Sequence, residues 1–229
     1  MNKTIGIIGA MDIEIDGLVA KMTNVNTKKI SSITFYQGEI SGKSVVVAKC
    51  GIGKVFASIC AQTMIMEFKP SVIINSGVAG TLTKELGVLD IAIAKNVAQH
   101  DMDTSSIGDP VGLISGINLV YIDANNDVVN ALENACKALN YKALSGTVAS
   151  GDKFVASYED KNRIATTFGA IACEMEGASI GQTCYVNNVP FGILRAISDG
   201  EGAELDYQEF APLAAKQSIK IVKKFIEEY

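Results

Sequence analysis

The chain has little of what several protein classes require. Its 229 residues include no tryptophan, 4 prolines and 1 histidine, and no low-complexity tract, internal repeat or proline-rich linker interrupts it. No apolar run reaches the roughly 20 residues that cross a bilayer. The apolar start of the chain meets Asp12 and Glu14 too early for a secretory signal. These absences predict a soluble, cytoplasmic protein with no membrane partner.

Positive charge is also scarce. Lysine and arginine together number 20 against 25 acidic residues, which gives a net charge of −5. The adjacent basic pairs are Lys28-Lys29 and Lys223-Lys224, and both are typical of a solvated surface. Because phosphate backbones are bound by clustered cations, we expect no nucleic-acid partner.

The cysteine and histidine content argues against a metal site. The 5 cysteines form no Cys-x-x-Cys pair, and His100 has no Cys or His neighbour at a zinc-binding spacing. We interpret the cysteines as reduced, buried thiols and expect no metal and no cofactor. For His100, a loop or hydrogen-bonding role is favoured over a catalytic one.

Hydrophobic patterning predicts strands that alternate with helices. Apolar runs predict strands at residues 4–8, 33–37, 44–48, 72–75, 88–94, 143–149, 170–174 and 191–197. Helical spacing predicts helices at residues 12–22, 55–68, 127–139, 158–168, 176–186 and 207–228. This alternation predicts an α/β fold, a single domain over residues 1–229 with a mixed, largely parallel central sheet flanked by helices on both faces. The polar segment 101–116 is long for a connection, which indicates a functional or interface loop.

Three carboxylates follow apolar segments: Glu14, Glu176 and Asp199. In an open α/β sheet, ligands bind beyond the carboxyl ends of the strands, so the three side chains are candidates for acid–base chemistry. For each one alone, a helix-capping role is favoured over a catalytic one, since Asp and Glu favour first turns. Together they favour a catalytic site.

Six short motifs follow one another along the chain. They are Gly6-Ile7-Ile8-Gly9-Ala10-Met11 with Glu14, Gly51-Ile52-Gly53-Lys54-Val55, Asn75-Ser76-Gly77-Val78-Ala79-Gly80, Ser150-Gly151-Asp152-Lys153-Phe154, Glu174-Met175-Glu176-Gly177-Ala178 and Arg195-Ala196-Ile197-Ser198-Asp199. In this order the set resembles the bacterial 5′-methylthioadenosine/S-adenosylhomocysteine nucleosidases of the nucleoside phosphorylase superfamily. The resemblance extends over essentially the whole chain, so a nucleoside phosphorylase-like catalytic domain is expected.

The resemblance implies hydrolysis of the bond between adenine N9 and ribose C1′ through an oxocarbenium-like transition state. Asp199 matches the acid that protonates adenine at N7, and we expect burial and neighbouring acids to keep a proton on it near neutral pH. Glu14 matches the general base for the attacking water. Glu176 matches the residue that holds the ribose hydroxyls by charge-assisted hydrogen bonds.

The resemblance also assigns the walls of the pocket, although ordinary core packing is an alternative for each wall residue. The substrate-binding positions are Met11, Ile52, Val78, Phe154, Val155, Met175, Arg195, Ser198 and, from a partner subunit, Ile107. Phe154 is expected to stack on the purine, with the Val155 backbone at adenine's edge and Met175 under the ribose. Arg195 is expected to orient Glu176. Val78 departs from the family's usual Ser or Thr, and Ile107 from its usual aromatic residue.

Two other functions remain open from the sequence. A phosphate-dependent purine nucleoside phosphorylase needs a cationic phosphate site, yet the only arginines are Arg163 and Arg195, and Asn75 stands where related phosphorylases have Arg. A non-catalytic nucleoside-binding protein has no need of all three carboxylates.

The expected partners are small-molecule adenine nucleosides and a second copy of the chain. The candidate substrates are methylthioadenosine, adenosylhomocysteine, 5′-deoxyadenosine and 6-amino-6-deoxyfutalosine, and the sequence does not rank them. The homodimer is inferred from the family and from four apolar loop residues, Ile107, Val111, Leu113 and Ile114.

Overall fold

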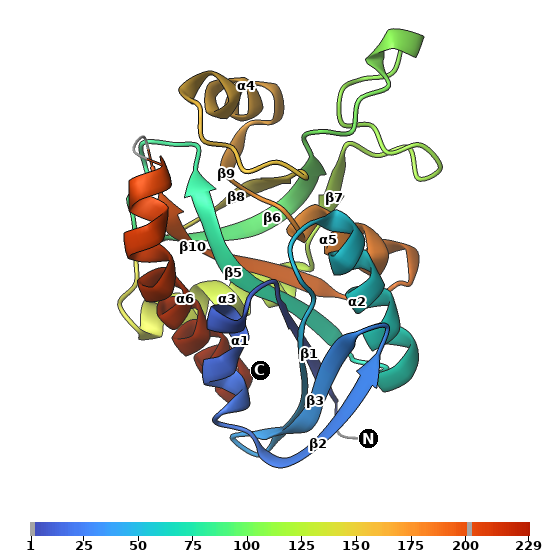
Figure 1. Cartoon of the computed structure of the whole chain (residues 1–229), viewed down its shortest axis with the longest axis vertical. Coiled ribbons are helices and arrows are strands. Elements are labelled where there is room, and N and C mark those ends of the chain that lie inside the picture. Colours follow the sequence, from blue (N-terminus) through green and yellow to red (C-terminus); the bar gives the residue numbers. More distant parts are fainter. Residues whose placement is uncertain (1–2, 201–202) are drawn as a thin grey trace.

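The predicted α/β fold is confirmed. The structure is a computed structural model that describes the backbone of residues 3–200 and 203–229, and the side chains of residues 3–200 and 207–229. One sheet of 10 strands runs through it, with helices against both of its faces (Figure 1). On one side α1, α3 and α6 pack together, and on the other α2 packs against α5.

The elements have the following bounds. The strands are β1 (Ile5–Gly9), β2 (Thr23–Ile30), β3 (Ile33–Ile40), β4 (Lys43–Lys49), β5 (Val72–Thr81), β6 (Ile91–Gln99), β7 (Tyr121–Asp123), β8 (Ala143–Ser150), β9 (Ala170–Glu174) and β10 (Phe191–Asp199). The helices are α1 (Asp12–Val19), α2 (Lys54–Phe68), the 3-10 turn η1 (Ser105–Ile107), α3 (Asn126–Ala138), α4 (Tyr158–Phe168), α5 (Gly177–Val186) and α6 (Ala203–Glu228).

The sheet order explains how distant segments meet. The strands are arranged β10-β6-β8-β9-β5-β1-β4-β3-β2, and β5 also pairs with β10, so five strands close into a ring. Pairings of β1 with β4 and β5, of β5 with β10, and of β8 with β6 and β9 are parallel. The β2–β3–β4 meander and the β5–β9, β6–β10 and β6–β7 pairs are antiparallel.

Two strands were not expected from the sequence, and each lacks the usual signal. Strand β2 has the polar sequence TNVNTKKI and is exposed over nearly its whole length at one end of the sheet. Strand β7 has three residues, too few for a recognisable period. A third difference is that β5 continues through residues 76–80, which the sequence suggested would end the strand.

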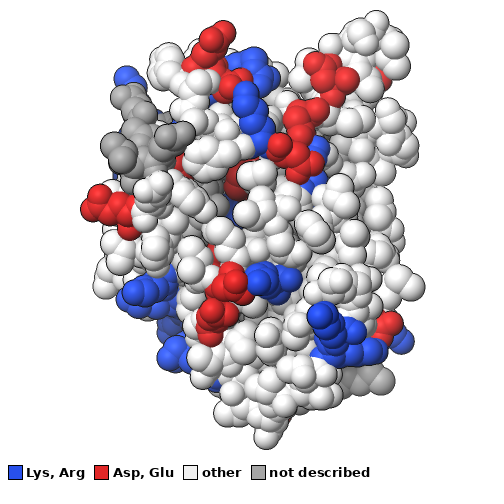
Figure 2. Space-filling view, viewed as in Figure 1, with Lys and Arg blue, Asp and Glu red and all other residues white. Residues whose placement is uncertain are grey.

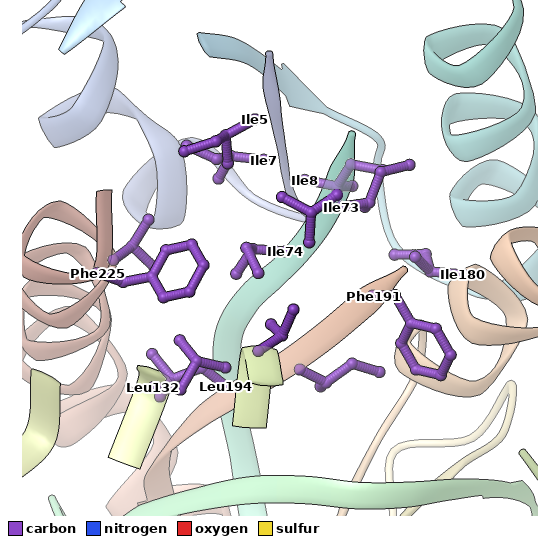
Figure 3. Close-up of a cluster of buried hydrophobic side chains, with 14 of the residues drawn as sticks. Ile5, Ile7, Ile8, Ile73, Ile74, Leu132, Ile180, Phe191, Leu194 and Phe225 are labelled. Carbon is purple, nitrogen blue, oxygen red and sulfur yellow. The ribbon is translucent and has the colours of Figure 1, made fainter. Parts of the chain in front are cut away.

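The core forms where β1 and β5 lie between the helical layers. Every residue of β1 is buried, and its isoleucines pack with Ile73 and Ile74 of β5 (Figure 3). Leu132 of α3, Ile180 of α5 and Phe225 of α6 reach the same cluster from the flanking helices. A sheet covered by helices on both faces buries both sides of its strands, which is consistent with the 48% hydrophobic content of the chain.

Two surface observations bear on partners. No helix among the described residues is long and apolar enough to cross a bilayer. On the face shown in Figure 2, acidic and basic side chains are interspersed among uncharged ones.

Candidate active site

A cavity of about 240 Å³ lies beyond the carboxyl ends of β1, β9 and β10. It is lined by ten of the positions expected from the sequence: Met11, Glu14, Ile52, Val78, Phe154, Val155, Met175, Glu176, Ser198 and Asp199. The remaining lining residues are Ala10, Ala79, Gly80, Lys153, Cys173, Glu174 and Tyr207. The three carboxylates that the sequence singled out therefore share one cavity.

Glu14 is held rigidly in the first turn of α1. Its Oε2 accepts hydrogen bonds from the backbone N–H groups of Ala10 (2.6 Å) and Met11 (3.0 Å), and its Oε1 accepts one from Val78 N (3.1 Å). The carboxylate thus caps its own helix as well as facing the cavity. Burial raises the pKa of Glu14, against the lowering effects of Arg195 and these N–H groups. A buried carboxylate of raised pKa is a better proton acceptor than an exposed one.

Arg195 lies in the interior behind the cavity. Its guanidinium Nη2 donates to the side chains of Glu174 and Asn75, and it lies 3.8 Å from Glu176 Oε2. The side chain is 1% exposed. Arg195 therefore contacts Glu176 as expected, but its closer carboxylate partner is Glu174.

Glu176 occupies the N-cap position of α5 and faces the cavity. Its Oε1 accepts a hydrogen bond from Gly53 N (2.8 Å). Gly53 has a φ of 95°, a conformation that favours glycine. Burial, and next the charge of Glu174, raise the pKa of Glu176 to about 7. The side chain therefore exchanges a proton near neutral pH and is well placed to bind hydroxyl groups.

Glu174 has a different set of partners. It accepts hydrogen bonds from the Ser150 hydroxyl, from Glu176 N (3.1 Å) and from Gly177 N (2.8 Å). Together with Arg195, these donors engage both carboxylate oxygens. Glu174 therefore fixes the start of α5. Glu176, the second acid of the Glu-Met-Glu segment, keeps an oxygen available to a ligand.

Asp199 ends β10 and is 3% exposed. Its Oδ1 accepts a hydrogen bond from Ser198 Oγ (3.0 Å), and its Oδ2 lies 3.1 Å from Lys161 Nζ. Burial was expected, and acidic side chains share the cavity, but the cation in contact with this carboxylate was not expected. A Cβ on Gly80, which pairs with Asp199 in the sheet, would lie 2.8 Å from Asp199 Oδ2. The absent side chain of Gly80 makes room for the acid.

Aromatic side chains form one wall of the cavity. Phe154 is 46% exposed at the mouth, and its ring stands edge-on to Tyr207 at 5.4 Å between centroids. The Tyr207 hydroxyl donates to Met11 Sδ (3.4 Å). Aromatic rings beside buried carboxylates suit a planar heteroaromatic base attached to a polar sugar.

Tyr207 and Lys161 were missed by the sequence analysis. Neither belongs to one of the six motifs. A signal for Lys161 was nevertheless present, since the buried positions of α4 are Lys161, Ile164 and Phe168. A lysine on the apolar stripe of a helix requires a partner. Tyr207 gave no comparable signal.

The expected loop residues lie away from the cavity. Ile107 is 80% exposed on the segment that projects from the body of the molecule beside β6 and β7 (Figure 1). Ile114 is buried in the chain's own core, whereas Val111, which packs against a second core cluster, and Leu113 are partly exposed. His100 is buried at the end of β6, and neither ring nitrogen has a hydrogen-bond partner among the described residues.

Comparisons with known proteins agree on one family. The model of the phosphorylase superfamily matches residues 4–227. The 5′-methylthioadenosine/S-adenosylhomocysteine nucleosidase of Psychromonas ingrahamii is 37% identical over 226 residues, which are 97% of this chain and 97% of that protein. The nucleosidase of the same description from Staphylococcus haemolyticus is 38% identical over 226 residues, 97% of this chain and 99% of that protein.

Solved structures give the same result. The 5′-methylthioadenosine/S-adenosylhomocysteine nucleosidase from Neisseria meningitidis, in complex with methylthio-immucillin-A, superimposes with a TM-score of 0.95 at 35% identity and covers 99% of this chain and 100% of its own. The futalosine hydrolase of Helicobacter pylori superimposes with a TM-score of 0.95 at 33% identity, covering 100% of this chain and 99% of its own.

Proposed function

We propose that this chain, which belongs to the phosphorylase superfamily, is a 5′-methylthioadenosine/S-adenosylhomocysteine nucleosidase. It hydrolyses the bond between adenine N9 and ribose C1′ and releases adenine and the 5-substituted ribose, as in methionine salvage. The observation that carries the proposal is the meeting of Glu14, Glu176 and Asp199 in one cavity with an aromatic wall. The curated relatives of the same description, matched over nearly their whole length, support it.

The proposed mechanism divides the work among the three carboxyl groups. Asp199 gives its proton to adenine N7 as the C1′–N9 bond breaks, and the electron pair of that bond moves into the purine. Glu14 takes a proton from water while the water oxygen bonds to C1′. Glu176 holds the ribose hydroxyls, and its negative charge stabilises the positive charge that develops on the sugar. Phe154 stacks on the base, while Val155 and Met175 complete its walls.

Water is favoured over phosphate as the acceptor. The guanidinium of Arg195 is already engaged by Glu174 and Asn75, and Arg163 is exposed on α4 beside Asp160. A phosphate dianion in the cavity would meet Glu14 and Glu176 without a free guanidinium to bind it. We expect adenine release from methylthioadenosine in phosphate-free buffer at the rate seen with phosphate. Strict dependence on phosphate would instead identify a phosphorylase.

Binding without catalysis is the remaining alternative. Asp199→Asn keeps the shape of the cavity and removes the acid. The proposed enzyme then loses most of its turnover but still binds adenine nucleosides, which calorimetry can measure. A variant that turns over as fast as the wild type would show that Asp199 is not the acid.

The proposed substrates include nucleosides with 5′-groups other than those of methylthioadenosine and adenosylhomocysteine. The residues that face adenine and ribose do not distinguish 5′-deoxyadenosine or 6-amino-6-deoxyfutalosine from them. The likeness to a futalosine hydrolase supports including the last. Values of kcat/KM over the four nucleosides rank the candidates, and a protein inactive on all four would contradict the proposal.

The proposal includes a cytoplasmic homodimer built from one catalytic domain per chain. Five cysteines are free and buried, as expected in a reducing compartment. Ile52 lines the cavity and is 56% exposed, and Val55 and Phe56 beside it are 70% and 52% exposed. Such side chains suit an interface that covers the cavity mouth, where Ile107 of the partner subunit would complete the 5′-group pocket. Light scattering at micromolar concentration tests this, since a fully active monomer would exclude a shared pocket.

A further inference from the structure

Lys161 is a buried lysine beside the proposed acid. The residue is 8% exposed, and the side chains of Lys161 and Asp199 are 10% and 4% exposed. The ammonium lies 3.1 Å from Asp199 Oδ2 and donates to the Gly200 carbonyl oxygen at 2.5 Å. A lysine is rarely buried without a strong partner, because removing its charge from water is costly. These two contacts on consecutive residues account for its burial.

The helix that carries Lys161, α4, is held by a cap at its N-terminus and by core packing of its buried side chains. Ser157 caps α4 by accepting a hydrogen bond from Asp160 N (3.1 Å), and Ile164 and Phe168 pack in the second core cluster. The ammonium is therefore delivered by a rigid element. Lys161 is not among the described residues that line the cavity, so it acts on a nucleoside through Asp199 and does not touch it.

Glu14, Glu174, Glu176 and Lys153 share the cavity with Asp199, and two further titratable groups beside it are uncharged near neutral pH. Burial raises the pKa of Cys173 on β9 to about 12, and burial likewise raises the pKa of the Tyr207 phenol on α6. On β10, Ser198 contributes a neutral hydroxyl. Among the described residues, the charge in direct contact with the Asp199 carboxylate is therefore the ammonium of Lys161.

We propose that Lys161 is a positioning residue for Asp199, which fixes the orientation of the carboxyl group and stabilises the carboxylate that remains once the proton has moved to adenine N7. The inference rests on the proposed function. As the proton leaves, negative charge appears on Asp199 at the distance of an ion pair from the ammonium, so the charge separation becomes less unfavourable. An ammonium in contact with a carboxyl group favours the charged form of that group, so the pH dependence of the rate tests this contact.

The test compares three substitutions at Lys161 over a range of pH. K161M and K161Q remove the charge, and K161Q retains a hydrogen-bond donor; K161R retains both. For K161M and K161Q we expect kcat to fall roughly 10- to 100-fold, a part of what a general acid contributes, with a smaller change in KM. Without the ammonium, the alkaline limb of the pH profile should move to higher pH. K161R should keep the wild-type limb and a kcat within a few fold.

A purely structural role predicts a different pattern. Rates would then fall equally at every pH, with the alkaline limb unmoved, and that result in K161M or K161Q would overturn the inference, as would wild-type behaviour. Thermal melts show which variants are folded. If K161M does not fold, K161Q still provides the test. The proposed function is checked separately by adenine release from the wild-type enzyme, so a working enzyme with an unchanged K161Q profile would refute the role of Lys161 alone.

Discussion

Removing the charge of Arg195 should destabilise the protein in a pH-dependent way. Its guanidinium is buried and faces Glu174 directly, with Glu176 at 3.8 Å. In Arg195→Met the side chain remains large and unbranched, but buried carboxylates lose their counter-ion. Breaking a buried pair in this way costs about 3–5 kcal/mol, so we expect a loss of about 4 kcal/mol at pH 8.

The loss should be smaller in acid, because a buried carboxyl group without its counter-ion takes up a proton. Wild-type Glu176 has a pKa of about 7, and in the variant it should hold its proton at least one pH unit higher. For each pH unit over which the folded variant carries one more proton than the folded wild type, the difference between their free energies of unfolding shrinks by about 1.4 kcal/mol. At pH 5.5 the expected loss is therefore roughly 2–3 kcal/mol.

Urea unfolding of both proteins at pH 8 and pH 5.5, at one protein concentration, measures the two differences. With an m-value of about 3 kcal/mol/M, the midpoint should drop by roughly 1.3 M at pH 8. R195M with Glu174→Gln is the matched control, and it should recover part of the loss because one unpaired carboxylate is gone. An equal loss at the two pH values would refute this electrostatic account of Arg195.

Three further substitutions probe the site. Glu14→Gln should lower kcat by roughly 10²–10⁴-fold, the range for a general base, with nucleoside binding retained; steady-state rates and calorimetry measure this, and a rate near wild type would exclude Glu14. The raised pKa of Glu176, about 7, should make wild-type stability fall by about 3 kcal/mol as pH rises from 4.5 to 8. Urea unfolding of Glu176→Gln should lack this slope, and a persistent slope would assign it elsewhere. Gly80→Ala places a Cβ 2.8 Å from Asp199 Oδ2 and should reduce kcat strongly, whereas Gly87→Ala, with its nearest atom at 3.7 Å, should leave it unchanged; equal kcat for both variants would show that the acid tolerates displacement.

The sheet and its helices were largely predictable because apolar runs report burial. Strands β1 and β5 are buried over nearly their whole length, and the apolar runs at residues 5–8 and 72–74 predicted where they begin. Strand β2 could not be found, since an exposed polar strand at the end of a sheet is specified by pairing with β3 and not by its own pattern.

The candidate site was predictable where side chains belong to local motifs. Glu14, Glu176 and Asp199 stand next to strand ends, and the sheet topology brings those ends together. Lys161 and Tyr207 come from helices whose position over the cavity depends on the tertiary fold. Neither the aromatic pair with Phe154 nor the ammonium on Asp199 is encoded by spacing along the chain.

The central claim is that Asp199 protonates the purine while Glu14 activates water on the opposite face of the sugar. A crystal structure of the enzyme with a non-hydrolysable adenine nucleoside tests it most directly. We expect an Asp199 oxygen within about 3 Å of adenine N7 and a water molecule between Glu14 and C1′ on the other side of the ribose. Both carboxyl groups on one side of the sugar, or either one out of reach of its atom, would contradict the claim.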